Sequence, residues 1–66
     1  MYAQIKAKIE ELGGTVHGGI NWTWAHFPDE KAAQEFHTWV TAPPINAETR
    51  GVYPPHGETP WGVRFR

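Results

Sequence analysis

The chain has 66 residues, no cysteine and a formal net charge of −1 from six basic and seven acidic side chains. This length allows one domain over residues 1–66, and the missing cysteine excludes disulfides and cysteine-based zinc motifs. The near-zero charge argues against a strongly basic nucleic-acid-binding protein, whose affinity comes largely from phosphate neutralisation.

Apolar residues at helical spacing predict two helices. The first covers residues 2–12 with one apolar stripe, and the pair Gly13-Gly14 predicts its end. The second covers residues 29–41 and begins at Asp29, where negative charge suits a helix N-terminus. The pair Pro43-Pro44 predicts that the second helix stops there.

Between these helices the sequence predicts two strands. Residues 15–17 are a short strand candidate, and Gly18-Gly19 predicts a two-residue turn or a glycine bulge. Residues 20–27 alternate with period 2 and form the best-defined strand. One face of that strand would carry Ile20, Trp22, Trp24 and His26, and the other Asn21, Thr23, Ala25 and Phe27.

Tryptophans are the largest apolar side chains available for a core. Each indole that is buried removes about 150–250 Å² of surface from water. We therefore expect the face with Trp22 and Trp24 to lie under the helices, and Trp39 and Trp61 to join the same core.

The C-terminal part predicts two further strands, at residues 50–53 and 61–66. The second alternates, with Trp61, Val63 and Phe65 on one face and the two arginines on the other. The loop 54–60 between the strands holds three prolines, so we expect no pairing within it.

The element order α-β-β-α-β-β predicts a small α+β two-layer sandwich, with an antiparallel sheet of three or four strands and two helices on one face. This order is similar to a ferredoxin-like fold that lacks its first strand, and the resemblance concerns topology alone. On this assignment the open face would show small and polar residues, namely Asn21, Thr23 and Ala25, together with Arg64 and Arg66.

The chain contains few candidate catalytic residues. Serine and cysteine, the commonest covalent nucleophiles, are absent, and the adjacent Glu10 and Glu11 would point apart on a helix. Three of the four histidines, His17, His26 and His37, could approach one another, but their spacing matches no standard metal motif. We therefore expect no enzyme activity, no metal and no cofactor.

Surface contacts remain as the expected function. We expect a small non-enzymatic protein-binding module that acts as an inhibitor or adaptor. Products of phages and mobile elements that block a host machine, including anti-CRISPR proteins, are often of this size. The loop 54–60 is the first candidate surface, because prolines reduce the entropy lost on docking. The candidate partner-binding residues are Tyr53, His56, Glu58, Arg50, Arg64 and Arg66.

Two other functions stay open. One is a nucleic-acid-binding module that uses the arginines of the open sheet face, and the other is a structural homo-oligomer formed through edge strands. The state would be a monomer or a homodimer. Because no apolar run could span a bilayer and no apolar leader follows Met1, we expect a cytoplasmic protein without membrane contact.

Overall fold

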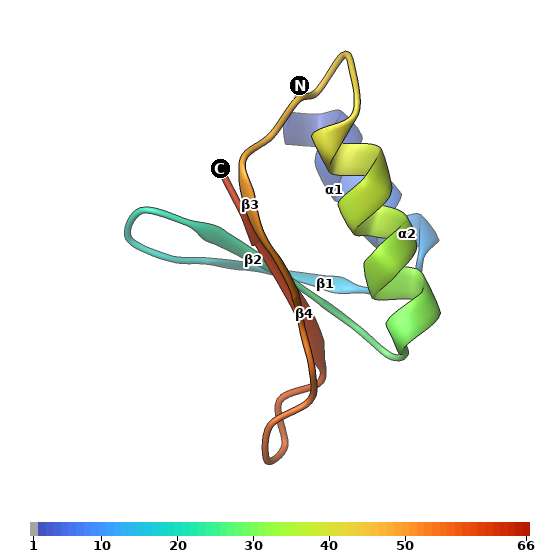
Figure 1. The fold of residues 1–66 in the computed structure, drawn as a ribbon, viewed down its shortest axis with the longest axis vertical. Helices are drawn as coiled ribbons and strands as arrows, with labels where there is room; N and C mark the ends of the chain where they lie inside the picture. The colour runs from blue at the N-terminus through green and yellow to red at the C-terminus, as the bar shows by residue number, and fades with distance from the viewer. Residues whose placement is uncertain (1) are drawn as a thin grey trace.

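The computed structural model describes residues 2–66 as two helices packed on one face of a four-stranded sheet (Figure 1). In chain order the elements are α1 (Tyr2–Glu11), β1 (Thr15–Gly18), β2 (Thr23–Phe27), α2 (Glu30–Thr41), β3 (Thr49–Tyr53) and β4 (Trp61–Phe65). Every neighbouring pair of strands is antiparallel, and the strand order in the sheet is β1-β2-β4-β3. The predicted α+β class and the order α-β-β-α-β-β are confirmed.

The strand order makes the topological resemblance more specific. β4 lies between β2 and β3 and runs antiparallel to both, so β2 and β3 are parallel to each other. The β2-α2-β3 unit is therefore a crossover whose two strands are separated by one other strand. A ferredoxin-like fold fills that place with the strand before its first helix. Here β4, which follows the other three strands in the chain, fills it instead.

Local signals fix the helix ends. Gly13 and Gly14 follow α1, and their N–H groups donate to the carbonyls of Glu10 and Ile9. Asp29 caps α2, because its carboxylate accepts a hydrogen bond of 2.8 Å from the N–H of Ala32. Both ends agree with the sequence-based prediction.

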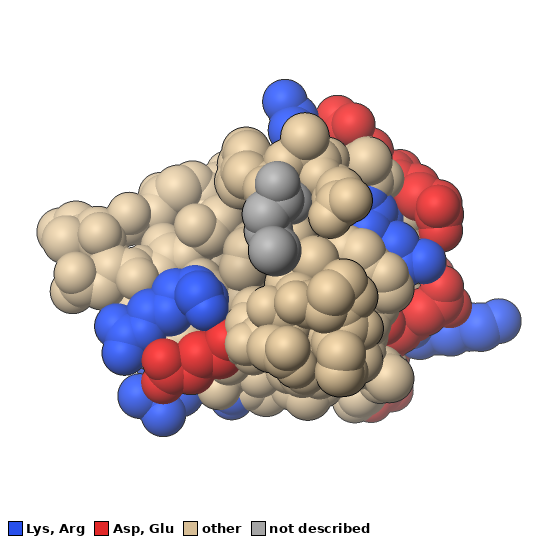
Figure 2. Space-filling view, turned by 90° about the horizontal axis from the view of Figure 1, so that it is seen from above, with Lys and Arg blue, Asp and Glu red and all other residues tan. Residues whose placement is uncertain are grey.

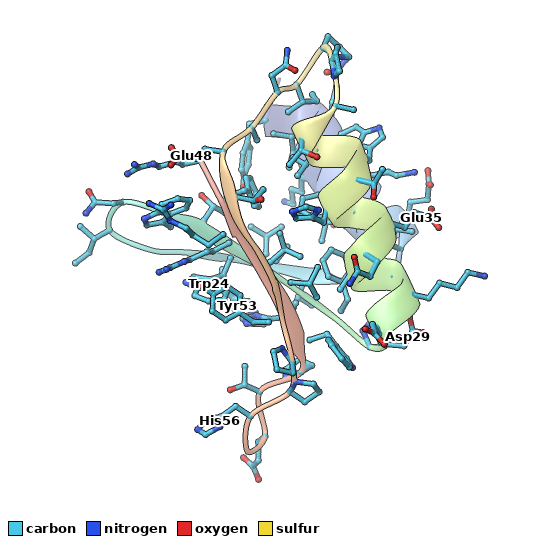
Figure 3. The ribbon with its side chains drawn as sticks, viewed as in Figure 1. Trp24, Asp29, Glu35, Glu48, Tyr53 and His56 are labelled. Carbon is cyan, nitrogen blue, oxygen red and sulfur yellow. The ribbon has the colours of Figure 1, made fainter. Side chains whose placement is uncertain are left out.

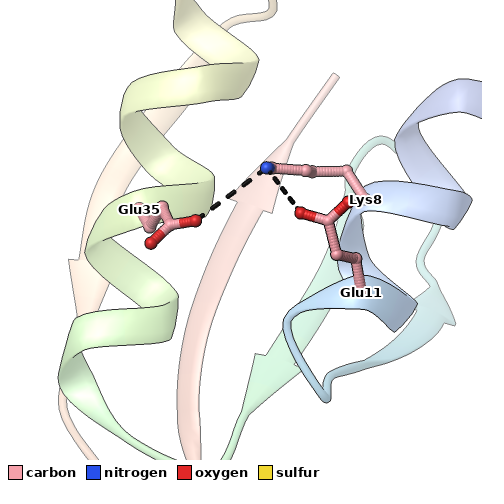
Figure 4. A network of polar contacts seen from close by, with 3 residues as sticks. All are labelled: Lys8, Glu11 and Glu35. Carbon is pink, nitrogen blue, oxygen red and sulfur yellow. Dashed lines mark hydrogen bonds and ion pairs between the residues drawn. The ribbon is translucent and has the colours of Figure 1, made fainter.

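The two helices are also joined by charges at their surface. Lys8 on α1 donates to Glu11 at 2.9 Å and lies 3.9 Å from Glu35 on α2 (Figure 4). The hydrogen bond with Glu11 raises the pKa of Lys8 above its ordinary value. The ammonium group also lies 5.9 Å from the ring centroid of Trp39, so the lysine covers part of that indole.

Phenylalanine, rather than tryptophan, forms the centre of the core. Phe36 on α2 lies 5.2 Å from Phe27 and 5.5 Å from Phe65, measured between ring centroids, and all three rings are buried. All four tryptophans keep part of their surface exposed, but only Trp22 and Trp24 lie away from the core, so the prediction of a tryptophan core is wrong for these two. Trp39 and Trp61 pack at the border of the core.

The predicted assignment of the two faces of β2 is also wrong. Ala25 and Phe27 are buried under the helices, whereas Trp24 lies on the opposite face. The register explains this arrangement, because Ala25 lies opposite the buried Val63 and Trp24 lies opposite Arg64. Alanines on the core side let α2 approach the sheet closely, which an indole at those positions would prevent.

The hairpins at either end of the sheet differ from the prediction in detail. β2 begins at Thr23 rather than Ile20, and Ile20 is fully exposed in the connection from β1 instead of lying in a core. The loop 54–60 does pair internally, because His56 and Thr59 exchange two backbone hydrogen bonds of 3.0 Å. Over residues 2–66, neither helix has the length and apolar character needed to cross a membrane.

Candidate functional site on the open sheet face

The face of the sheet turned away from the helices collects aromatic rings and all three arginines of the chain. Trp24 and Tyr53 lie side by side on this face (Figure 3), with ring centroids 5.3 Å apart. We call the whole group the open-face cluster, and it consists of His17, Trp22, Trp24, His26, Tyr53, Arg50, Arg64 and Arg66.

Arg64 on β4 lies at the centre of this cluster. Its guanidinium carbon is 5.2 Å from the ring centroid of Trp22, 5.5 Å from that of Tyr53 and 5.8 Å from that of Trp24. The Nε atom is buried against these rings and has no hydrogen-bond partner within residues 2–66. In the same part of the chain no carboxylate lies within ion-pair distance of Arg64, so its charge is held by ring faces alone.

Arg50 and Arg66 both lie against the ring of Trp22. The guanidinium carbon of Arg66 is 4.3 Å from the Trp22 centroid and that of Arg50 is 5.1 Å away. With Arg64, three cations from β3, β4 and the residue after β4 therefore lie around one partly exposed indole. This arrangement restricts their positions while Arg50 and Arg66 stay exposed.

Trp24 and His26 follow one another on the open face of β2. Their rings are nearly parallel, with an interplanar angle of 8° and centroids 5.8 Å apart. Gly62 of β4 lies opposite His26, and a Cβ atom there would come within 3.2 Å of His26 and 3.3 Å of Trp24. The absence of a side chain at Gly62 thus leaves room for both rings to lie against the sheet.

A bulge in β3 brings two of the cluster residues to the same face. The register of β3 against β4 shifts between Thr49 and Val52, and Gly51 in this interval has a φ of 90°. In a regular strand Tyr53 would share the core side with Thr49. The extra residue instead places Tyr53 opposite Gly62, on the face that also carries Arg50.

Charges of the two layers are separated in space. The three arginines lie on the open-face cluster, whereas the three lysines lie on the helices together with most of the acidic residues. Figure 2 shows blue side chains gathered about a single red group on the left, apart from the mixed charges on the right. The open face is therefore basic although the net charge of the chain is −1.

Two histidines extend the cluster toward β1. The ring centroids of His17 and His26 are 4.9 Å apart, and Thr15 Oγ1 lies 3.1 Å from His17 Nε2. Burial lowers the pKa of His26, and the neighbouring His17 lowers it further. His37 instead lies on the helix side, 2.9 Å from Thr49 Oγ1, so these three histidines do not meet. Within residues 2–66 no group of three ligating side chains could hold a metal ion.

The structure divides the candidate residues named from sequence into two groups. Tyr53 and the three arginines meet on the open face. His56 and Glu58 lie instead on the exposed loop 54–60, and Figure 3 shows His56 near the tip of this projecting hairpin.

Sequence reasoning missed Trp22, Trp24, His17 and His26 as site residues, because it placed them on the side of the sheet assigned to the core. The signal that could have found them is the alternation of β4, which places Arg64 and Arg66 on one face. Indoles on a paired strand can cover such arginines as well as they can fill a core.

Comparison of the chain with protein-family models, with curated proteins and with solved structures found no match.

Proposed function

We propose that this protein binds single-stranded nucleic acid on the open-face cluster. Unpaired bases would stack on the rings of Trp24, His26 and Tyr53, and the arginines would neutralise phosphates. The observation that carries the proposal is the meeting of partly exposed aromatic rings and three arginines on the uncovered face of a small sheet. RRM domains stack unpaired bases on aromatic side chains of a sheet, and OB-folds combine such stacking with positive charge along the backbone.

The form of the face favours a single strand over a duplex. Stacking needs a base whose ring face is accessible, and a duplex buries those faces between neighbouring base pairs. The open face is a sheet surface without an enclosed pocket anywhere over residues 2–66. Stacking is tolerant of base identity, so we expect weak sequence preference.

The number of cations limits the electrostatic part of the affinity. If the three arginines together neutralise two or three phosphates of a single strand, log Kd should change with log salt with a slope of about 1.4 to 2. Arg64 should contribute to this slope, because no carboxylate pairs with it in the described part of the chain. Stacking on the rings should supply the part of the affinity that salt does not remove.

The test measures fluorescence anisotropy of labelled oligonucleotides of about ten nucleotides, as RNA, as single-stranded DNA and as duplex. We expect both single strands to bind and the duplex to bind much more weakly. Arg64→Ala should weaken binding and reduce the salt slope by about 0.7. Lys31→Ala, which removes an exposed cation from α2, is the matched control and should leave both unchanged.

A protein partner is the second candidate function. The observation that favours it is the loop 54–60, in which every residue is exposed and the backbone is closed by the bonds between His56 and Thr59. An inhibitor or adaptor would use His56 and Glu58 there. Absence of oligonucleotide binding, together with a partner that is lost on changing these two residues, would favour this function over the first.

A further inference from the structure

The carboxylate of Glu48 lies between two arginines of the open-face cluster. Arg66 Nε donates to Glu48 Oε1 at 3.0 Å, and Arg50 Nη2 lies 3.8 Å from Glu48 Oε2. Figure 3 shows Glu48 beside the upper part of β3. Each of its two oxygens thus faces a different guanidinium group, and the side chain is half exposed.

Backbone pairing fixes the position of this carboxylate. The N–H of Glu48 donates to the carbonyl of Arg66 at 2.9 Å, and the N–H of Arg66 donates to the carbonyl of Glu48 at 3.0 Å. These bonds continue the ladder of β3 and β4 by one residue pair beyond the strands. Arg66 is held on its other side by Trp22, at 4.3 Å. Glu48 is therefore positioned by the sheet rather than by a chance meeting of two long side chains.

We propose that Arg50 and Arg66 form a phosphate subsite, and that the Glu48 carboxylate occupies this subsite while no nucleic acid is bound. Carboxylates and phosphates accept hydrogen bonds from guanidinium groups with similar geometry. When nucleic acid binds, one of its phosphates replaces the Glu48 carboxylate. This inference rests on the proposed function and names the place of one phosphate on the face.

The three arginines therefore differ in how they meet a phosphate. Arg64 has no carboxylate partner in the described residues, so it binds a phosphate without first losing an ion pair. Arg50 and Arg66 bind only after an ion pair is lost, so Glu48 lowers the affinity of the whole face. Removing this carboxylate, without changing either arginine, should tighten binding.

The test compares Glu48→Gln with Glu35→Gln, each of which removes one half-exposed carboxylate. Glu35 lies on α2 and pairs with Lys8, so its loss changes the total charge equally but leaves the subsite untouched. Affinity for a single-stranded oligonucleotide is measured at about 0.15 M salt, where screening acts over about 8 Å. We expect Glu48→Gln to tighten binding by about twofold to thirtyfold, which corresponds to the loss of two exposed ion pairs. Glu35→Gln should change it less than twofold.

Three outcomes separate the inference from the proposed function. If the wild type binds and neither variant changes the affinity, the subsite is wrong while nucleic-acid binding stands. If both variants tighten binding equally, total charge explains the gain and the subsite is again wrong. If none of the three proteins binds any oligonucleotide, the proposed function falls and the inference falls with it. A second measurement adds Arg66→Ala to Glu48→Gln, which should abolish the gain.

Discussion

Replacing Trp24 with alanine distinguishes most sharply between a core and a binding face. In the structure Trp24 lies on the open face, stacked against His26 and edge-on to Tyr53, with Arg64 above its ring. Aromatic pairs contribute about 0.5–1.5 kcal/mol each, and an exposed cation–π contact contributes about 0.5–1 kcal/mol. Because some of these contacts re-form with the remaining neighbours, we expect Trp24→Ala to lower the free energy of unfolding by about 1–2 kcal/mol.

Phe36→Ala is the contrasting variant. Phe36 is fully buried between Phe27 and Phe65, and loss of such a ring costs about 3–5 kcal/mol. A domain of this size has little more stability than that to lose. Urea denaturation followed by far-ultraviolet circular dichroism should therefore find Trp24→Ala folded in buffer and Phe36→Ala largely unfolded.

The same Trp24 variant should lose much of its binding. Removing a stacking platform costs about 1–3 kcal/mol per base, which weakens binding by about 5-fold to 150-fold. Trp24→Phe should retain part of the affinity, and Tyr2→Ala, an exposed aromatic on α1, should retain all of it. If Trp24→Ala unfolds the protein as Phe36→Ala does, or binds as the wild type does, the description of the open face as a binding surface is refuted.

Three further predictions concern the site and its support. Gly62→Ala should push the rings beside it out of position and weaken oligonucleotide binding several-fold in an anisotropy titration, whereas Gly18→Ala has open space around its Cβ atom and should bind as the wild type does. The pKa of His26 is lower in the folded than in the unfolded chain, so the unfolded chain binds more protons as the pH falls. The free energy of unfolding should therefore fall between about pH 7 and pH 5. An unchanged urea midpoint over this range would contradict the lowering of the His26 pKa by burial. The His26→Gln variant should show a smaller fall. Asp29→Ala removes the cap of α2 and should lower the free energy of unfolding, measured by urea denaturation, by about 1 kcal/mol.

Local signals in the sequence predicted most of the fold. The cap at Asp29, the glycines after α1 and the alternation of β4 each depend on neighbours in the chain, and each prediction is confirmed. The lengths of β1 and β3 were also close to those observed.

The choice between the two faces of β2 could not be made in this way. Period 2 shows that Trp24 and Ala25 point in opposite directions, but only the pairing with β4 decides which of them meets the helices. Size was a misleading guide, because three phenylalanines and the small residues of α2 already fill the core. The indoles then find their partners among the arginines.

The total charge was also a poor guide to the charge of the open face. The total of −1 sums the two layers, whereas a ligand on the sheet meets only the charges near that face. The bulge at Gly51 was also invisible, since the sequence there does not show how β3 is registered against β4. Without the bulge, Tyr53 could not be placed beside Trp24.

The central position of β4 has a consequence for how the protein forms during synthesis. In the sheet the backbones of β2 and β3 do not pair with each other, and both pair with β4, which is synthesised after them. Without β4, β2 lacks a partner along one of its edges and β3 lacks any partner strand. The complete sheet therefore depends on pairing between distant parts of the chain, and the open-face cluster cannot form before β4 supplies Arg64.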